Sequence, residues 1–201
     1  MWDAAYQEEA YIFGTAPNDF LAGAYDHFPK GDLLSLGEGE GRNAVFLATH
    51  GYQVVAVDAA ASGFVKGQKL AEAHQVAVNW QHADLNDYSL GKQRWDGILS
   101  IFCHLPPELR KKVHLGAVHA LRPNGVFLLE AYAPAQLRYG TGGPQSLAML
   151  PTLSELLQDF PGLKVLHAQT IERNVTEGTR HTGLAMVNQL VLKKEVVSID
   201  V

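Results

Sequence analysis

The sequence predicts an α/β fold: a seven-stranded, mostly parallel sheet with helices on both faces and an antiparallel hairpin at its C-terminal end. Three observations support this prediction. Short β-branched runs alternate with helix-length amphipathic stretches. The runs are apolar almost throughout, as is typical of parallel strands buried on both faces. The first run ends in a glycine-rich turn that leads directly into a helical pattern.

The elements follow one another without a repeat, a low-complexity tract or a long linker. Turn chemistry supports several boundaries, since Gly51 can end a helix in the left-handed region and the Pro-Asn-Gly sequence before residue 126 stops another. The last run carries Asn188 and Gln189 in its middle, which favours an edge position or a hairpin over the centre of a sheet. The expected strands are 32–36, 53–57, 77–81, 97–101, 125–130, 164–169 and 183–192, and the expected helices are 18–27, 42–50, 63–74, 107–120 and 152–157.

Composition narrows the possible partners and compartments. The 201 residues carry a formal net charge of −5 and no Lys/Arg cluster that would indicate nucleic-acid binding. No apolar run approaches the roughly 20 residues of a membrane span, and the first residues lack the features of a signal peptide. Cys103 is the only cysteine, so an internal disulfide is impossible. We therefore expect a cytoplasmic protein with no nucleic-acid, membrane or metal partner; its oligomeric state stays open.

The glycine-rich turn is the strongest functional signal in the chain. Gly37, Gly39 and Gly41 follow the first expected strand, and such a turn leaves backbone N–H groups free and lets a ligand approach closely. Asp58 ends the second expected strand, where an acid can accept hydrogen bonds from ribose hydroxyls. Together they indicate a nucleotide or nucleoside site.

The residues between the glycines argue against a phosphate ligand. Glu38 and Glu40 would repel a pyrophosphate, and the third glycine of the dinucleotide fingerprint is replaced by Arg42. An adenosine ligand that carries a sulfonium and an ammonium group in place of phosphates has no such penalty. S-adenosylmethionine fits that description.

At this point the chain resembles the class I S-adenosylmethionine-dependent methyltransferases over about residues 32–132. The resemblance implies a single Rossmann-like methyltransferase domain over 1–201, with an N-terminal lid or helix segment (1–31), a cofactor-binding core (32–132) and a substrate loop with the C-terminal hairpin (133–201). It is carried by Leu34-Ser-Leu-Gly-Glu-Gly-Glu-Gly41, Val55-Ala-Val-Asp58, Ala83-Asp84-Leu85, Trp95-Asp-Gly-Ile-Leu-Ser100 and Leu121-Arg-Pro-Asn-Gly-Val126.

A narrower resemblance is to small bacterial methyltransferases of the tellurite-resistance type. This family usually has an acidic residue two positions before the first glycine, where this chain has Ser35. The matching segments are Phe13-Gly-Thr-Ala-Pro-Asn18 and Gly41-Arg-Asn-Ala-Val-Phe-Leu-Ala48; Gln136-Leu137, Gly140-Thr-Gly-Gly-Pro144 and Glu177-Gly-Thr-Arg-His-Thr-Gly183 resemble a related branch.

The resemblance, together with the residues that follow the expected strands, indicates candidate site residues. His104 follows the fourth strand and is the candidate general base, because an imidazole can titrate near neutral pH; its alternative role is structural. The substrate-pocket candidates are Tyr132, Arg138 and His181. The cofactor-binding candidates are Tyr11, Gly37, Glu38, Gly39, Gly41, Arg42, Asp58, Ala59, Asp84, Leu85, Ser100 and Phe102.

The sequence thus predicts an enzyme that transfers a methyl group from S-adenosylmethionine to a small-molecule acceptor by in-line displacement. Two alternatives remain open. A non-catalytic S-adenosylmethionine-binding module is compatible with the serine at position 35. A nicotinamide-dependent oxidoreductase is disfavoured by Arg42 and the two glutamates of the turn.

Overall fold

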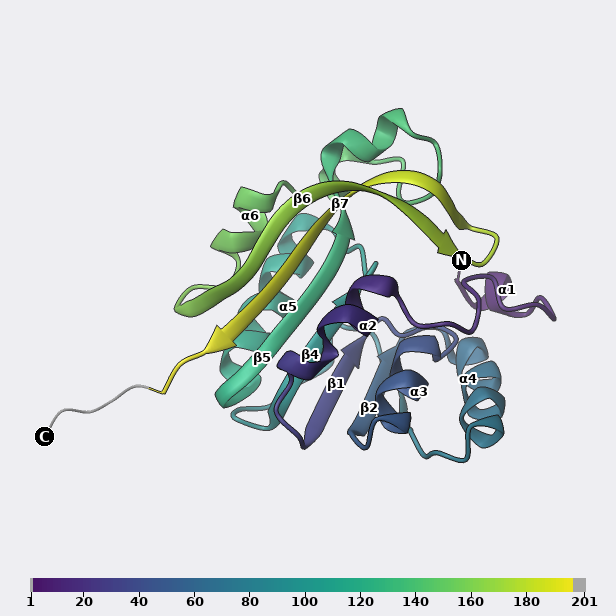
Figure 1. Ribbon diagram of the computed structural model, residues 1–201, viewed down its shortest axis with the longest axis horizontal. Helices are drawn as coiled ribbons and strands as arrows, with labels where there is room; N and C mark the ends of the chain where they lie inside the picture. Colours follow the sequence, from purple (N-terminus) through teal and green to yellow (C-terminus); the bar gives the residue numbers. More distant parts are fainter. Residues whose placement is uncertain (1, 197–201) are drawn as a thin grey trace, which may run out of the picture.

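The computed structural model describes residues 2–196, and its seven strands form one sheet in the order β3-β2-β1-β4-β5-β7-β6 (Figure 1). The first five strands pair in parallel, whereas β7 is antiparallel to both β5 and β6. The predicted fold class is therefore confirmed. The strands are β1 (Asp32–Leu36), β2 (Gln53–Asp58), β3 (Asn79–His82), β4 (Trp95–Ile101), β5 (Leu121–Tyr132), β6 (Leu163–Glu177) and β7 (His181–Lys194).

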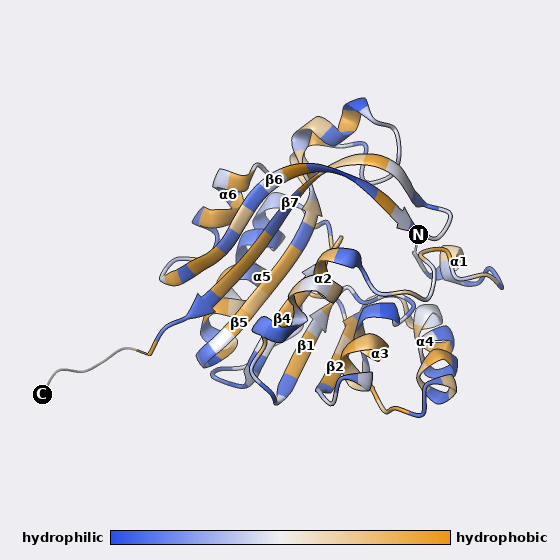
Figure 2. Ribbon diagram, in the orientation of Figure 1, coloured by the Kyte–Doolittle hydropathy of each residue, from blue (hydrophilic) through white to orange (hydrophobic). Residues whose placement is uncertain are grey.

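Helices cover both faces of the sheet. One buried cluster joins α2 and α3 to one face through residues such as Leu21 and Leu47. A second cluster joins α5 and α6 to the other face through Val113 and Leu156. Figure 2 shows the apolar character concentrated along the strands between these layers. The helices are α1 (Trp2–Tyr6), α2 (Asp19–Ala24), α3 (Arg42–Thr49), α4 (Ala61–Ala73), α5 (Pro107–Ala120) and α6 (Leu153–Gln158), with 3-10 turns η1 (Tyr25–His27), η2 (Pro134–Arg138) and η3 (Leu147–Met149).

The C-terminal hairpin has longer strands than the sequence predicts. Of the two positions that the sequence left open for β7, the hairpin is confirmed, because β7 pairs antiparallel with β6, whereas the edge strand is β6. Asn188 and Gln189 are tolerated inside the sheet because each has partners: the Asn188 amide donates to the Pro151 carbonyl at 2.8 Å, and Gln189 donates to Glu130 at 2.7 Å. Buried polar side chains are stable when they are hydrogen-bonded in this way.

The strand order reverses between β1 and β4, and ligands of open α/β sheets bind beyond the carboxyl ends of the strands at such a point. The tip of the β6–β7 hairpin lies near α1 in Figure 1. A hydrogen bond of 2.9 Å from the Thr179 amide to the Ile12 carbonyl ties the tip to the N-terminal segment. The hairpin and the N-terminal segment thus meet beside the carboxyl ends of the central strands.

Candidate functional site

The glycine turn has the geometry that its sequence requires. Gly37, Gly39 and Gly41 have φ values of 62°, 66° and 93°, a region that other residues enter at a cost. A Cβ on Gly37 would lie 2.6 Å from the Cys103 sulfur, and one on Gly39 would lie 2.6 Å from the Tyr6 hydroxyl. Backbone conformation and lack of space therefore both require glycine here.

Asp58 lies at the end of β2, directly beside this turn. One carboxylate oxygen accepts the Gly39 amide at 2.8 Å, and the other accepts the Ala60 amide at 2.8 Å. Burial raises the pKa of Asp58, and the two backbone hydrogen bonds partly offset that effect. The side chain is only partly buried, so lone pairs remain for hydroxyl groups of a ligand.

The other candidates at the strand ends differ in exposure. Asp84 is exposed after β3, and its side chain accepts the Asn86 amide at 2.7 Å, so it stabilises a turn. Leu85 is buried in the core, Ala59 is exposed, and Ser100 is buried within β4. Their proposed contacts with an adenosine group stay predictions.

Glu38 stabilises the start of α3. Its carboxylate accepts the amides of Asn43 and Ala44 at 3.1 and 3.0 Å, and the Ser35 hydroxyl also donates to it. A carboxylate at a helix N-terminus is favourable because of the free N–H groups and the helix dipole. Ser35, which stands two residues before the first glycine, is thus a hydrogen-bond partner of Glu38.

Glu40 changes the electrostatic argument made from the sequence. Its carboxylate forms a buried ion pair of 2.6 Å with Lys66 of α4 and accepts the Phe13 amide at 3.2 Å. Because Lys66 compensates this charge, Glu40 does not act as a free anion that repels a phosphate. In the structure, Glu40 connects the N-terminal segment to α4. Lys66 of α4 adds a second connection, because it also donates to the Ala10 carbonyl at 2.7 Å.

Arg42 has a carboxylate partner within the chain. Its guanidinium lies 2.6 Å from Glu177, and both side chains are buried. The expectation that Arg42 pairs with a ligand carboxylate rested on the affinity of guanidinium for carboxylate. In this structure Glu177, at the end of β6, meets that need.

Tyr6 contacts the glycine turn, whereas Tyr11 does not extend toward it. The Tyr11 hydroxyl donates to the Lys66 carbonyl at 2.9 Å, and its ring packs with Val45 and Leu70. Tyr6 is buried beside Gly39, and burial together with the charge of Asp58 raises its pKa. The aromatic residue from the N-terminal segment at this turn is therefore Tyr6.

His104 has structural contacts that do not suit a general base. Its Nε2 accepts the Tyr132 amide at 3.1 Å, so the lone pair is already used. Burial is the main reason that its pKa falls to about 3, with a further contribution from nearby His181. Proton transfer to Nε2 would break the hydrogen bond to Tyr132, and we assign His104 no catalytic step.

Tyr132 and His181 come together with Phe102, as the sequence-based pocket requires. The Phe102 ring centroid lies 4.6 Å from that of Tyr132 and 4.8 Å from that of His181. Phe102 has a φ of 50°, an unusual value for a residue with a side chain, directly after β4. Arg138 is exposed on η2, so the structure does not bring it into this buried group.

A buried polar network beside this group was not predicted. Glu130, at the end of β5, accepts from Arg173 at 2.8 and 2.6 Å, from Asn18 at 2.5 Å and from Gln189 at 2.7 Å. Asn18 also donates to Glu177 at 2.7 Å. The network joins the N-terminal segment to β5, β6 and β7. The sequence placed Glu130 at the end of a strand, but it ended the next strand at residue 169, and nothing in it indicated the partners of Glu130 or Glu177.

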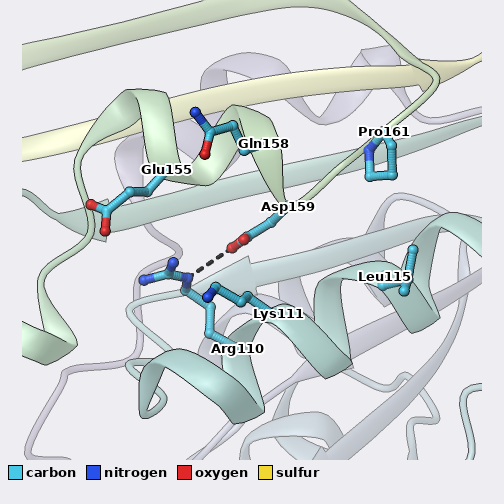
Figure 3. A pocket seen from close by; sticks show the side chains of 7 residues that line it. All are labelled: Arg110, Lys111, Leu115, Glu155, Gln158, Asp159 and Pro161. Atoms are coloured by element: carbon cyan, nitrogen blue, oxygen red, sulfur yellow. Dashed lines mark hydrogen bonds and ion pairs between the residues drawn. The ribbon is translucent and has the colours of Figure 1, made fainter.

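A hollow of about 460 Å³ lies away from this site, between α5 and α6 (Figure 3). Arg110 and Asp159 form a buried ion pair of 2.7 Å in its wall, and His114 lies 3.0 Å from the same carboxylate. Burial raises the pKa of Asp159, but hydrogen bonds from His114 and Arg110 outweigh burial and lower it below 3.8. The cluster fixes α6 to α5.

This lowered pKa predicts how the cluster contributes at different pH. A carboxyl group with a lowered folded-state pKa stabilises the fold above its unfolded-state value and loses that contribution as the pH falls through the folded-state value. We expect Asp159→Asn to reduce stability at neutral pH. When the pH is lowered from neutral to below 3.8, the ordinary pKa of an aspartate, the free energy of unfolding should fall less in the variant than in the parent. Urea unfolding over a pH series tests this, and identical acid dependence in both proteins would contradict it.

The family comparison concerns the region around the glycine turn. Residues 33–125, a little under half of the chain, match the model described as "Methyltransferase domain". The match confirms the resemblance that the sequence motifs carry, and the matched range contains the glycine turn, Asp58 and His104.

A curated relative also matches about two thirds of the chain. It is the 2-heptyl-1-hydroxyquinolin-4(1H)-one methyltransferase of Mycobacteroides abscessus, 28% identical over 134 residues. The alignment covers 65% of this chain and 58% of the relative, less than two thirds of the relative's length.

Two solved structures share the fold of the chain. One, solved in work on conversion of a disulfide bond into a thioacetal group during echinomycin biosynthesis, has a TM-score of 0.77 and 17% identity; the match covers 98% of this chain and 92% of that one. The other is TehB from Haemophilus influenzae, with a TM-score of 0.70, 17% identity, and coverage of 96% of this chain and 66% of that one. At such identity the likeness concerns the fold.

Membrane-spanning helices and metal-binding clusters are both absent from the described residues. None of the helices in residues 2–196 is long and apolar enough to cross a membrane. Over the same range, no group of three or more His, Cys, Asp and Glu side chains is arranged to hold a metal ion.

Proposed function

We propose that the protein is an S-adenosylmethionine-dependent methyltransferase that methylates a small-molecule acceptor by in-line displacement. The observation that carries the proposal is the left-handed glycine turn beside Asp58 at the strand-order reversal, inside a methyltransferase domain. When bound, S-adenosylmethionine supplies an electrophilic methyl group on a sulfonium sulfur. No observation favours a non-catalytic module or a nicotinamide-dependent enzyme.

The residues present fit this cofactor. The left-handed glycine turn lies directly beside Asp58, which is proposed to accept hydrogen bonds from ribose hydroxyls. Asp84 and Leu85 are proposed to border the adenine. Tyr6 and the N-terminal segment are proposed to cover the site, exclude water and align the acceptor, since displacement at a methyl group depends strongly on alignment.

The curated relative suggests an acceptor class. Its printed name describes methylation of an alkylated hydroxyquinolinone, and we propose a hydroxylated aromatic acceptor of comparable size for this chain. The half-buried ring of Phe102 and the buried rings of Tyr132 and His181 support the proposal, because planar aromatic side chains suit a flat ligand. A cytoplasmic location is also proposed, since the single cysteine is compatible with a reducing compartment.

Isothermal titration calorimetry with S-adenosylhomocysteine tests the cofactor. We expect Asp58→Asn to bind it about 10- to 100-fold more weakly, because the loss of hydrogen bonds to a charged acceptor costs about 1.5–3 kcal/mol. The exposed Asp26→Asn is the control and should bind like the parent. Absence of binding to the parent, or tighter binding of NAD⁺, would contradict the proposed function.

A further inference from the structure

Two polar atoms are buried without partners next to each other at the carboxyl end of the sheet. They are the Tyr132 hydroxyl oxygen and His181 Nδ1. A Cβ on Gly142 would lie 3.0 Å from the Tyr132 hydroxyl and 2.9 Å from Cδ2 of His181, so both side chains face the same loop. Buried polar atoms are nearly always paired in folded proteins. The unpaired Tyr132 hydroxyl, with the His181 imidazole beside it, therefore points to a ligand that hydrogen-bonds at this place.

Aromatic rings surround His181, and they favour a flat ligand. Its ring lies 4.6 Å from Phe13 and 4.8 Å from Phe102, measured between ring centroids, and 5.3 Å from Tyr132. These rings come from the N-terminal segment, the end of β4 and the end of β5. Aromatic walls with a few convergent polar atoms are typical of sites for planar organic molecules.

Glu177 gives His181 a second feature. Glu177 is the last residue of β6 and His181 the first of β7, so they face each other across the hairpin turn. Oε2 of Glu177 lies 3.7 Å from Nδ1 of His181. Arg42 and Asn18 hold the carboxylate at 2.6 and 2.7 Å. Although burial raises the pKa of Glu177, the effects of His181, Arg42 and Asn18 bring it down to about 2. An ionised carboxylate on this side of the imidazole favours the tautomer with the proton on Nδ1, which leaves the Nε2 lone pair free to accept a proton.

The other titratable groups near His181 do not remove this effect. His104 stays neutral because burial lowers its pKa to about 3. Burial also raises the pKa of Tyr132, so its hydroxyl stays protonated and can donate. Arg42 is cationic, but its 2.6 Å pairing with Glu177 leaves no unpaired positive charge there.

We propose, on the basis of the proposed function, that His181 is the general base and Glu177 its positioning residue for an acceptor that is a planar aromatic hydroxyl compound. As the acceptor oxygen bonds to the methyl carbon, the carbon–sulfur bond breaks and its electron pair stays on sulfur. The acceptor's proton passes to Nε2 of His181, because Nδ1 faces Glu177, and then to solvent. The Tyr132 hydroxyl donates to the acceptor oxygen and orients it.

A spectroscopic titration tests proton acceptance without any turnover. The phenolate of 4-nitrophenol absorbs at longer wavelength than the phenol, so its absorbance reports where the proton lies. We expect 4-nitrophenol to bind the S-adenosylhomocysteine complex as phenolate at a pH about one unit below its own pKa. His181→Gln should bind it as phenol, and Glu177→Gln should give an intermediate fraction. Binding as phenol to the parent would overturn the proposal.

Rates with two phenols give the second test. General-base catalysis contributes about 10²- to 10⁴-fold, so His181→Gln should slow transfer to the weakly acidic 1-naphthol about 100-fold or more. Transfer to 4-nitrophenol, which is largely ionised at mildly alkaline pH, should fall about tenfold or less. His167→Gln is the matched control, because it also removes a buried unpaired histidine nitrogen of the hairpin, and it should change neither rate.

The outcomes separate this proposal from the proposed function. Equal rate losses with both phenols in His181→Gln would overturn the base assignment. Binding of S-adenosylhomocysteine to the parent without transfer to either phenol would overturn the acceptor class and leave the cofactor proposal standing. Calorimetric binding of S-adenosylhomocysteine to His181→Gln and Glu177→Gln confirms that both variants are folded.

Discussion

Glu130→Gln is expected to lower the free energy of unfolding by about 3–5 kcal/mol, because removal of one partner leaves a buried charge uncompensated. Glu130 has no solvent exposure, and its carboxylate accepts four hydrogen bonds. The donors are two nitrogens of Arg173, the side-chain amide of Asn18 and the side-chain amide of Gln189. The amide nitrogen of a glutamine would face donors in place of acceptors, and Arg173 would lose its closest carboxylate. Urea unfolding monitored by tryptophan fluorescence measures the difference.

Glu108→Gln is the control for this substitution. Glu108 is exposed and lies 3.5 Å from Lys111 in a solvent-screened pair, so the change should leave stability nearly unaltered. Equal stability of Glu130→Gln and the parent would show that the buried network contributes nothing to folding. A large loss is also expected to loosen the N-terminal segment, which the network reaches through Asn18.

Gly178→Ala is the second substitution with a large expected effect. Gly178 has a φ of 62°, and a Cβ there would lie 2.2 Å from the Ile12 carbonyl oxygen and 2.6 Å from the Gly14 nitrogen. Left-handed strain costs about 1–2 kcal/mol, and overpacking against backbone adds about 1–3 kcal/mol. We expect a loss of about 2–5 kcal/mol and faster proteolysis between residues 7 and 18.

Gly162→Ala separates strain from crowding in this experiment. Gly162 has a φ of 79°, yet no atom lies within 4 Å of a Cβ built on it. Its replacement should cost only the left-handed strain and leave proteolysis of the N-terminal segment unchanged. If the two variants are equally stable and equally resistant, the close approach of Gly178 to Ile12 has no energetic importance.

The sequence was most informative where local chemistry determines structure. β1 begins and ends at the predicted residues because an apolar run stops at a glycine that must adopt a left-handed conformation. The strand ends brought Asp58 next to the glycine turn, as the parallel arrangement requires. Such features depend on neighbours in the chain and on the general rules of α/β sheets.

Side-chain partners distant in sequence were less predictable. The sequence suggested ligand contacts for Arg42 and effects on a phosphate for Glu40, but each pairs with a charged residue distant in sequence, Glu177 and Lys66. A charged residue at a predicted site can satisfy another charge of the fold, and the sequence does not say which. The contact of His104 was unpredictable for a similar reason: the backbone amide of Tyr132 that donates to its Nε2 lies 28 residues away in the sequence.

The contacts of Asn18 have a consequence for the order in which the chain is made. Asn18 leaves the ribosome early, whereas its partners Glu130 and Glu177 are separated from it by 112 and 159 residues. The N-terminal segment cannot reach its final position until the hairpin has been synthesised. During translation the ends of β1 and β2 therefore remain uncovered by this segment, and the nascent chain is open there to chaperones and proteases.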